Sequence, residues 1–577
     1  MIKRYLPILS WIGSYDRKWL QGDLVAGITL GGMLVPQGMA YAMIVGMPPI
    51  HGLYAALLPQ LVYAFMGTSR QLAVGPVAMD SLLVATGVGT LGLIGVGAHV
   101  QAVLLLTLLI GGIQLLLGML RMGFFVNFLS KPVIGGFSTA AAILIGLGQL
   151  HHILGVDSVS AGGLHLLLGN ILERLQLLHP LSLGIGIGAL ALMIFLGRIK
   201  KGLPIPLIMV VLGILAVSLF GLEAKGVRIV GYIPQGLPHF GIPSMDWDSM
   251  GPLLPIALTV ALFGFMESVS IAKSLEERHP EYELDADQEL RALGFSNILG
   301  SLFQSFSVSG SFSRSAVNDR AGAKTGLSLI ISALIIGAVL LFLTPLFHNL
   351  PTLVLGAIII LAVVPLMDFK YPKKLWTYGK DEFSLWALTF LSTLFIGLME
   401  GILLGVLLSL ALLVYRTSKP HMPVLGRIRG TDYFKNIDRF TEDVEVDADI
   451  LILRFDSQLY FGNKDFFKKR LHQEMEKKGP SLKYVILNAE PISYMDSSAV
   501  NMLEGLIREL TERDIQFMVA AAIGPTRDIL NSSGTVALLG EENFFVQTMD
   551  AVAFAREHKE RSTIQRKVSS QTLTKSS

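Results

Sequence analysis

One stretch of the sequence carries an unusual set of side chains for its apolar surroundings. "SFSVSGSFSRSAVNDR", residues 305–320, contains six serines and Arg314. A guanidinium inside a bilayer is costly unless it faces a cavity or a partner, and hydroxyls can donate hydrogen bonds to an anion. These residue types together predict a polar cavity for a negatively charged solute. A second interpretation is that the serines pack helices and that Arg314 pairs with Asp80, Glu267 or Asp319.

A second interrupted segment occurs earlier in the chain. It is "GTSRQLAVGPVAMDSLLVATG", residues 67–87. Both segments begin with an extended run, at residues 70–75 and 305–310, and continue as a short helix rich in small residues. A half-helix that begins at mid-membrane directs its unpaired N–H groups and its positive dipole end at that point, and Pro76 suits a first helical turn. Two such segments in corresponding halves of the chain predict an inverted repeat around a central anion site.

Three further polar residues lie inside apolar helical patterns. Glu267, within "ALTVALFGFMESVSIAKSL", is a carboxylate deep in a predicted membrane helix, which makes it a functional candidate. It can take up a proton, or help to bind Na⁺, as an anion enters; alternatively it forms a static ion pair with Arg314. Gln37 and Tyr41 lie one helical turn apart in "PQGMAYAMIVGMPP". Cavity lining and hydrogen bonding between helices explain these two residues equally well.

The composition indicates which elements hold these residues. Of 577 residues, 52% are hydrophobic and 16% are charged, whereas soluble proteins average about 25% charged residues. The sequence therefore predicts a membrane protein. A net charge of +2 gives no indication of nucleic acid as a partner, and the absence of cysteine excludes disulfides and thiolate chemistry. We expect no cofactor, no metal site and no catalytic residue.

The apolar segments predict a membrane domain of about fourteen spans. The predicted segment centres are near Leu30, Leu58, Leu82, Leu109, Leu144, Ala191, Leu212, Leu262, Ile298, Ala316, Ile335, Ile359, Leu391 and Leu407. Lys and Arg concentrate in alternate loops, which predicts that both termini are cytoplasmic. After about residue 418, strand-like runs alternate with amphipathic helices, as in a soluble α/β domain.

This pattern predicts four regions along the chain. They are a cytoplasmic N-terminal segment at residues 1–20, a transmembrane transport domain at 21–418, a soluble domain at 424–557 and a disordered tail at 558–577.

The quoted motifs resemble those of the sulfate permease (SulP) family of anion transporters. "PQGMAYAMIVGMPPIHGLYAALLPQLVYAFMGTSRQLAVGPVA", "FLSKPVIGGFSTAAAILIGLGQL", "FGFMESVSIAK", "LRALGFSNILGSLFQSFSVSGSFSRSAVN" and "LPTLVLGAIII" occur in the family's order. The resemblance covers most of the chain. It implies an α-helical membrane protein with a 7+7 inverted repeat of the uracil-permease type, divided into core and gate domains. The third and tenth spans would be half-helices that face each other, and a cytoplasmic α/β STAS domain would follow.

The resemblance also implies roles for particular residues. Glu267 matches the eighth-span carboxylate of coupled symporters. The residues that match the anion site are Gln37 and Tyr41 on the first span, Pro76, Val77 and Ala78 at the third, and Ser311, Phe312, Ser313 and Arg314 at the tenth.

The soluble domain contains one motif with two interpretations. "YMDSSAVNML", residues 494–503, is similar to the phosphorylatable loop of bacterial anti-sigma-factor antagonists, with Asp496, Ser497 and Ser498 matching. Asp followed by Ser is also an ordinary helix N-cap, and we take capping as the default. The STAS domain and the resemblance together lead us to expect a homodimer.

The sequence thus predicts a secondary active transporter of an inorganic oxyanion rather than an enzyme. We expect sulfate as substrate, H⁺ as the coupling cation on Glu267, and a multi-pass protein of the cell (inner) membrane bilayer. The alternatives are Na⁺-coupled transport of bicarbonate or dicarboxylates, an uncoupled exchanger or channel, and a membrane-tethered regulator. A channel gains nothing from a buried carboxylate beside the anion path, and intact half-helix motifs argue against a regulator.

Overall fold

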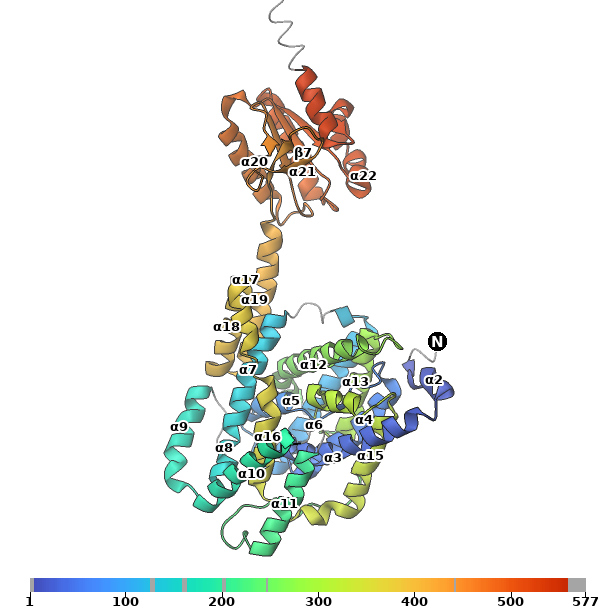
Figure 1. The fold of residues 1–577 in the computed structure, drawn as a ribbon, viewed down its shortest axis with the longest axis vertical. Coiled ribbons are helices and arrows are strands. Elements are labelled where there is room, and N and C mark those ends of the chain that lie inside the picture. Colours follow the sequence, from blue (N-terminus) through green and yellow to red (C-terminus); the bar gives the residue numbers. More distant parts are fainter. Residues whose placement is uncertain are drawn as a thin grey trace, which may run out of the picture. The chain divides into compact units, whose positions relative to one another are not determined.

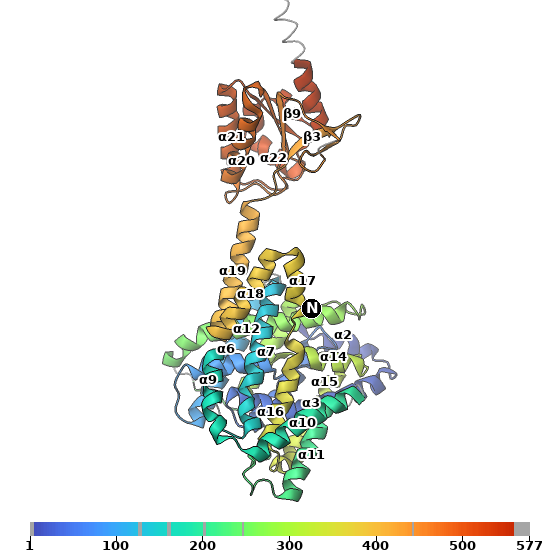
Figure 2. The ribbon, with the colours of Figure 1, turned by 60° about the vertical axis from the view of Figure 1, so that its left-hand side comes forward.

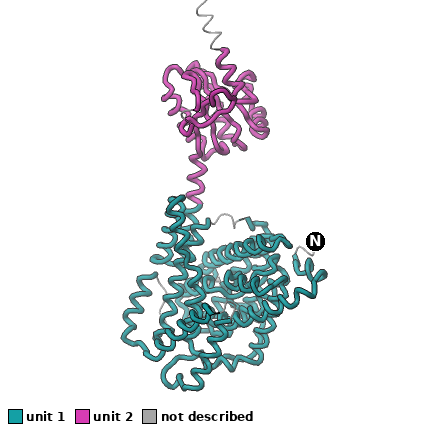
Figure 3. The backbone as a smooth tube through the Cα atoms, in the orientation of Figure 1, with its two compact units in different colours: residues 1–409 teal, residues 410–577 magenta. Residues whose placement is uncertain are grey.

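The computed structural model describes residues 5–124, 130–157, 163–199, 204–244, 247–440 and 443–558. The predicted tail, apart from its first residue, lies outside these ranges, as do the first four residues of the N-terminal segment. The chain forms two compact units, Met1–Ser409 and Leu410–Ser577 (Figure 3).

The first unit is helical (Figure 1). Its chain begins with the short elements α2 (Ile8–Trp11) and η1 (Ile12–Ser14). The first seven main helices are α3 (Trp19–Val45), α4 (Pro49–Met66), α5 (Ala78–Gly89), α6 (Val96–Met119), α7 (Lys131–Gly148) with α8 (Leu150–Leu154), α10 (Pro180–Ile199) and α11 (Ile205–Phe220). Helix α9 (Leu164–Arg174) and η3 (Leu175–Leu177) precede α10.

Seven further main helices complete the membrane part. They are α12 (Trp247–Glu276), α13 (Ala286–Leu302), α14 (Phe312–Arg320), α15 (Leu327–Ala338), α16 (Thr352–Val363), α18 (Lys380–Phe395) and α19 (Leu398–Ser418), the last of which enters the second unit. The shorter elements are η4 (Val339–Leu343), η5 (Thr344–Phe347), η6 (Val364–Leu366) and α17 (Lys370–Tyr378). Each of the fourteen predicted segment centres lies inside one of the main helices.

Eight helical segments in the described residues are long and apolar enough to cross a membrane. The third and tenth main helices, α5 and α14, are much shorter than a full span of about 20 residues. Small residues allow neighbouring helices to approach closely. A side chain at Gly294 of α13 would lie 2.7 Å from the backbone nitrogen of Leu115 on α6.

The helix contacts repeat with a shift of seven helices, which is the pattern of a 7+7 inverted repeat. The second helix, α4, packs on the eleventh, α15, and correspondingly the ninth, α13, packs on the fourth, α6. The first and eighth helices also occupy corresponding positions, since the first, α3, contacts the eleventh, α15, and the eighth, α12, contacts the fourth, α6. Helices α7 and α16 lie side by side at the middle of this arrangement (Figure 2).

The second unit is an α/β domain built on a seven-stranded sheet with the order β4-β3-β6-β7-β8-β9 and β5 paired to β3. Strands β6 (Ile450–Arg454), β7 (Tyr484–Asn488), β8 (Gln516–Ala520) and β9 (Phe544–Phe545) are parallel. Strands β3 (Val424–Ile428), β4 (Phe434–Asn436) and β5 (Val444–Glu445) form the antiparallel edge.

Helices cover both faces of this sheet, as its apolar strands require. Leu451 and Leu453 of β6 face one hydrophobic core, whereas Ile450 and Ile452 face the other. The helical elements are α20 (Lys464–Lys478), η7 (Gly479–Ser481), α21 (Ser497–Glu512), α22 (Gly524–Ser532), α23 (Thr535–Leu539), η8 (Glu541–Asn543) and a final helix at residues 548–558. The predicted α/β fold of the C-terminal part is confirmed.

Candidate functional site

The two interrupted segments meet as a pair of short strands. Strand β1 (Val74–Gly75) runs antiparallel to β2 (Ser309–Gly310), with Val74 opposite Gly310 and Gly75 opposite Ser309. Helix α5 begins a few residues after β1, and α14 begins directly after β2. Neither segment is a continuous helix, so the predicted change from extended chain to short helix is confirmed for both.

Hydrogen bonds across 240 residues of sequence hold the two half-helix starts together. The backbone N–H of Ser311 donates to the carbonyl of Ala73 at 3.0 Å, and the N–H of Ala73 donates to Ser315 Oγ at 2.8 Å. Further along α14, Asn318 Nδ2 donates to the carbonyl of Gln71 at 3.0 Å. The start of α5 and the start of α14 are therefore parts of one fixed structure.

Both half-helices begin without a side-chain cap. Val77 and Ser311 occupy the N-cap positions in extended conformation, and neither side chain accepts a hydrogen bond from its helix. The first-turn N–H groups of a helix have no intrahelical partner, and such groups form a ready anion-binding site. Ser311 Oγ lies 3.4 Å from Ser313 Oγ and adds a hydroxyl to this region.

Arg314 is fully buried, with 0% of its surface exposed. Its Nη1 donates to the carbonyl oxygen of Pro76 at 2.8 Å, which connects α14 to the segment just before α5. Its Nε and Nη2 have no hydrogen-bond partner among the described residues. Asp319, one of the predicted partners, instead bonds to His279 at 2.7 Å and Arg278 at 3.4 Å. Within the described part of the chain, the guanidinium thus keeps two donor groups free.

Glu267 lies in the C-terminal half of α12, close to the half-helix starts. It is partly exposed although both of its chain neighbours are buried, and its Oε2 atom is buried with no hydrogen-bond partner in the described part of the chain. The neighbouring Ser268 accepts a hydrogen bond from the Gly310 N–H at 2.7 Å, which attaches α12 to β2. Glu267 is near enough to Arg314 for the two charges to interact. The two side chains form no ion pair within 4.0 Å, and Arg314 forms no salt bridge with any described residue.

Gln37 and Tyr41 reach the same region from α3. Both are buried, at 4% and 5% exposure, and Gln37 Oε1 has no hydrogen-bond partner among the residues that the structure describes. Tyr41 interacts electrostatically with Arg314 and Glu267. Helix α4 approaches α3 closely beside Gln37, because a side chain at Gly38 would lie 2.6 Å from the Gly52 carbonyl oxygen.

The two half-helix starts differ in exposure. Pro76, Val77 and Ala78 are buried, whereas Phe312 is 58% exposed and Ser313 is also exposed. The side chains at the first turn of α14 are thus accessible from outside the protein, whereas the start of α5 is enclosed. The candidate site is therefore open on the α14 side.

Several residues that organise this region were not singled out from the sequence. Ser315, Asn318 and Ser268 hold the half-helices and α12 together. The sequence indicates Asp80 only as a possible ion-pair partner of Arg314. The sequence position of Asp80 could have indicated a functional role. A carboxylate in the first turn of a half-helix opposes anion binding there unless its charge is neutralised.

In the soluble domain, Asp496 acts as the N-cap of α21. Its Oδ1 accepts from the Ala499 N–H at 2.9 Å, and its Oδ2 accepts from the Phe461 N–H at 2.9 Å. The interpretation of this motif as structural capping is confirmed.

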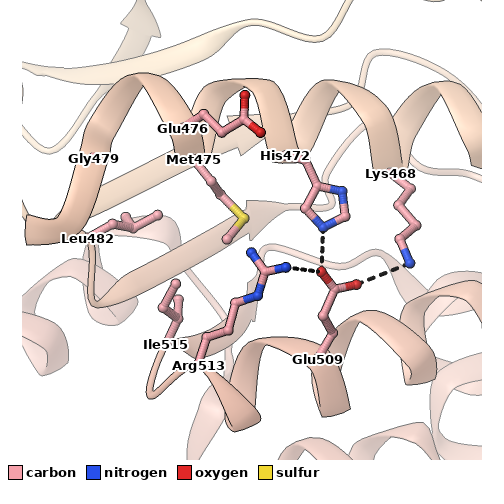
Figure 4. Close-up of a pocket in the computed structure, with 9 residues that line it drawn as sticks. All are labelled: Lys468, His472, Met475, Glu476, Gly479, Leu482, Glu509, Arg513 and Ile515. Atoms are coloured by element: carbon pink, nitrogen blue, oxygen red, sulfur yellow. Dashed lines mark hydrogen bonds and ion pairs between the residues drawn. The ribbon is translucent and has the colours of Figure 1, made fainter.

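A pocket in the same domain lies between α20 and α21 (Figure 4). Glu509 bonds there to His472 at 2.7 Å, to Arg513 at 3.0 Å and to Lys468 at 3.1 Å. Partial burial opposes ionisation, but the hydrogen bonds from Lys468 and His472 outweigh it and lower the pKa of the Glu509 carboxyl. The three basic groups are thus directed at one carboxylate and form a local charge cluster.

Two short helices that begin beside a pair of antiparallel strands, inside a repeated helical bundle, define a multi-pass membrane transporter rather than an enzyme. The chain belongs to the sulfate permease family of anion transporters. The sequence model of the Sulfate permease family matches residues 20–389, and that of the STAS domain matches residues 433–551.

Curated relatives extend over nearly the whole chain. "Sulfate transporter 4.1, chloroplastic" of Arabidopsis thaliana is 39% identical, covering 98% of this chain and 84% of that protein. "Probable sulfate transporter MT1781" of Mycobacterium tuberculosis is 32% identical, covering 96% of this chain and 98% of that protein.

Solved structures share the fold. The murine Slc26a9 anion transporter in the inward-facing state matches with a TM-score of 0.89 at 25% identity, covering 96% of this chain and 94% of that one. The transmembrane domain of the cyanobacterial bicarbonate transporter BicA matches with a TM-score of 0.58 at 22% identity, covering 69% of this chain and 97% of that domain.

Proposed function

We propose that this protein takes up sulfate by proton-coupled symport, with the anion held between the N-termini of α5 and α14. The observation that carries the proposal is the juxtaposition of two uncapped half-helix starts with a buried guanidinium that has two free donor groups. Helix N-termini and fixed positive charge stabilise an oxyanion. The names of the curated relatives support sulfate as the oxyanion.

The proposed binding residues surround this point from three helices. Phe312 and Ser313 border the open side, and Arg314 supplies positive potential from behind. The full set is Gln37, Tyr41, Pro76, Val77, Ala78, Ser311, Phe312, Ser313 and Arg314. The anion would receive hydrogen bonds from backbone N–H groups and hydroxyls, which suits a ligand that only accepts hydrogen bonds.

Sulfate uptake into a negatively charged cell requires a coupled cation. A membrane potential opposes anion entry by about 2.3 kcal/mol per charge per 100 mV, and sulfate carries two charges. Glu267 is the proposed carrier, because a carboxylate with one buried, unpartnered oxygen and access to solvent can bind and release a proton. Movement of the half-helix core against the remaining helices would then expose the site to the other side.

Ion-gradient experiments in liposomes test the substrate and the coupling ion. Purified protein should accumulate labelled sulfate when the outside is acidic and the membrane potential is clamped at zero. A Na⁺ gradient at equal pH should drive no uptake, and excess bicarbonate or dicarboxylate should compete poorly. Uptake driven by Na⁺ and specific for bicarbonate would contradict the proposal, and sulfate flux that equilibrates without accumulation would indicate an uncoupled exchanger or channel.

We further propose that the protein is a homodimer in the cell membrane with both termini in the cytoplasm. The chain has no cysteine, so a single introduced cysteine is a specific probe. Ile94→Cys, between α5 and α6, should react with an impermeant maleimide added to whole cells, whereas Tyr433→Cys should react only after lysis. These positions are 96% and 73% exposed. The opposite labelling pattern would contradict the proposed orientation. Light scattering of the purified protein measures its mass and so tests the homodimer.

A further inference from the structure

Asp80 occupies an unexpected position for a carboxylate. It lies in the first turn of α5, the half-helix whose N-terminus we propose as an anion site. It is 1% exposed, and its Oδ1 has no hydrogen-bond partner among the described residues. The side-chain donor that the described residues place near it is the Ser309 hydroxyl. A desolvated carboxylate with so little hydrogen bonding is unfavourable in its ionised form, and here it would also repel a bound oxyanion. The position is compatible with anion binding only when the carboxyl group is neutral.

Asp80 and Glu267 belong to one cluster. A side chain at Gly264 of α12 would lie 3.2 Å from Asp80 Oδ2 and 3.2 Å from the Cβ of Ser309. Gly264 precedes Glu267 by three residues, so both positions share one face of α12. The two carboxylates interact electrostatically. The absence of a side chain at Gly264 is thus what allows the Asp80 carboxylate to reach α12 near Glu267.

The other ionisable groups around α5 are few. Helix α3 brings Tyr41 and α14 brings Arg314 to the same cluster. The ionisable groups of α6 and α7 are engaged elsewhere, since His99 bonds to the Val45 carbonyl and Lys131 lies over the ring of Tyr371. The local charge is therefore set by Arg314 and the two carboxylates.

The charge of this cluster decides whether it attracts sulfate. With both carboxylates ionised, one positive and two negative charges leave a net charge of −1, which repels an anion. With both protonated, Arg314 leaves a net charge of +1, which attracts it. Uptake of two protons thus changes the cluster from one that repels an anion to one that attracts it, and two is also the number of protons that balances the charge of sulfate.

We infer that Asp80 is a second proton-carrying carboxylate and that the protein moves two protons with each sulfate. This inference rests on the proposed proton-coupled function and adds its stoichiometry. Each carboxylate takes one proton from water on the outer side to form an O–H group, and loses that proton on the inner side after sulfate leaves. The loaded carrier then moves no net charge of substrate, so an inside-negative potential does not oppose uptake.

Sulfate accumulation at equilibrium reports the number of coupled protons. In proteoliposomes at zero potential, a gradient of about one pH unit contributes about 1.36 kcal/mol for each proton, or tenfold accumulation. Wild type should accumulate sulfate about 100-fold and Asp80→Asn about tenfold. Asp80→Asn should also become sensitive to an inside-negative potential. Asp319→Asn is the matched control, because its carboxylate is already paired with His279 and Arg278, and it should keep the wild-type ratio.

The outcomes separate this inference from the proposed function. Unchanged accumulation in Asp80→Asn, or complete loss of accumulation with sulfate exchange intact, contradicts the role of Asp80. Tenfold accumulation by wild type contradicts two-proton coupling but leaves proton symport standing, whereas no pH-driven accumulation by wild type contradicts the proposed function itself. If Asp80→Asn does not fold, a pH-sensitive dye measures protons per sulfate in wild type, and a ratio of one overturns the inference.

Discussion

Replacement of Glu267 by Gln should remove one coupled proton and lower sulfate accumulation at least about tenfold in a gradient of about one pH unit at zero potential. Gln is similar in size but cannot carry a proton. Under an inside-negative potential of about 100 mV, each uncompensated charge costs a further 2.3 kcal/mol or so, which should prevent net accumulation. Sulfate–sulfate exchange should continue, because exchange requires no net proton movement.

The exchange assay distinguishes a coupling defect from a folding defect. Glu267→Gln that neither exchanges nor accumulates sulfate would report only lost structure, so the variant is compared with Glu277→Gln, an exposed carboxylate just beyond the same helix. Glu277→Gln should match wild type in both assays. Wild-type accumulation by Glu267→Gln, with an unchanged dependence on external pH, would remove Glu267 from the mechanism.

The half-helices could be predicted because polar, irregular interruptions of an apolar segment have few explanations inside a membrane. Irregular backbone at membrane depth occurs only where it lines a cavity or is buried in protein, and segments 67–87 and 305–320 both carry such interruptions. The pairing of Val74 with Gly310 could not be predicted, because strands of two residues have no periodic signal. Their register depends on long-range hydrogen bonds such as the one from the Ala73 N–H to Ser315 Oγ.

The partner of Arg314 illustrates a second limit. Three carboxylates were possible from the sequence, and their choice depends on how each helix is rotated. Asp319 follows Arg314 by five residues, which places it about 140° away around the same helix. Asp80 and Glu267 are on other helices, so only the packed structure shows that Arg314 Nη1 binds the Pro76 carbonyl instead. From the sequence, Asp80 is a candidate counter-ion of Arg314, whereas the structure makes it a candidate proton carrier.

The helix count was predictable for a different reason. Most of the fourteen main helices have an apolar centre that stands out from the flanking loops, whereas the polar helix α14 was recognised by its interrupted serine-rich pattern. Helices α9 and α17 were not predicted because each is shorter than about a dozen residues and mixes apolar with polar side chains. Such helices depend on contacts with the rest of the protein rather than on a membrane-length apolar run.

Replacement of Arg314 by Gln should abolish measurable sulfate binding while leaving the helical fold intact. Arg314 is the one positive charge in the cluster with Asp80, Glu267 and Tyr41, and two of its donor groups have no partner in the described residues. Unit charges about 4 Å apart interact by about 4 kcal/mol at an effective dielectric constant near 20. We therefore expect the Kd for sulfate to rise at least about 100-fold, equivalent to about 2.8 kcal/mol. The measurement is binding of labelled sulfate to detergent-purified protein at acidic pH.

Arg314→Lys is the informative control for this prediction. It keeps the charge but loses the planar fork that places Nη1 on the Pro76 carbonyl. If Arg314 acts through its electrostatic field, Arg314→Lys should retain most of the binding that Arg314→Gln loses. If it contacts the anion directly, both variants should bind weakly. Melting temperatures without sulfate separate lost binding from lost packing, and wild-type affinity in a folded Arg314→Gln variant would show that the anion site lies elsewhere.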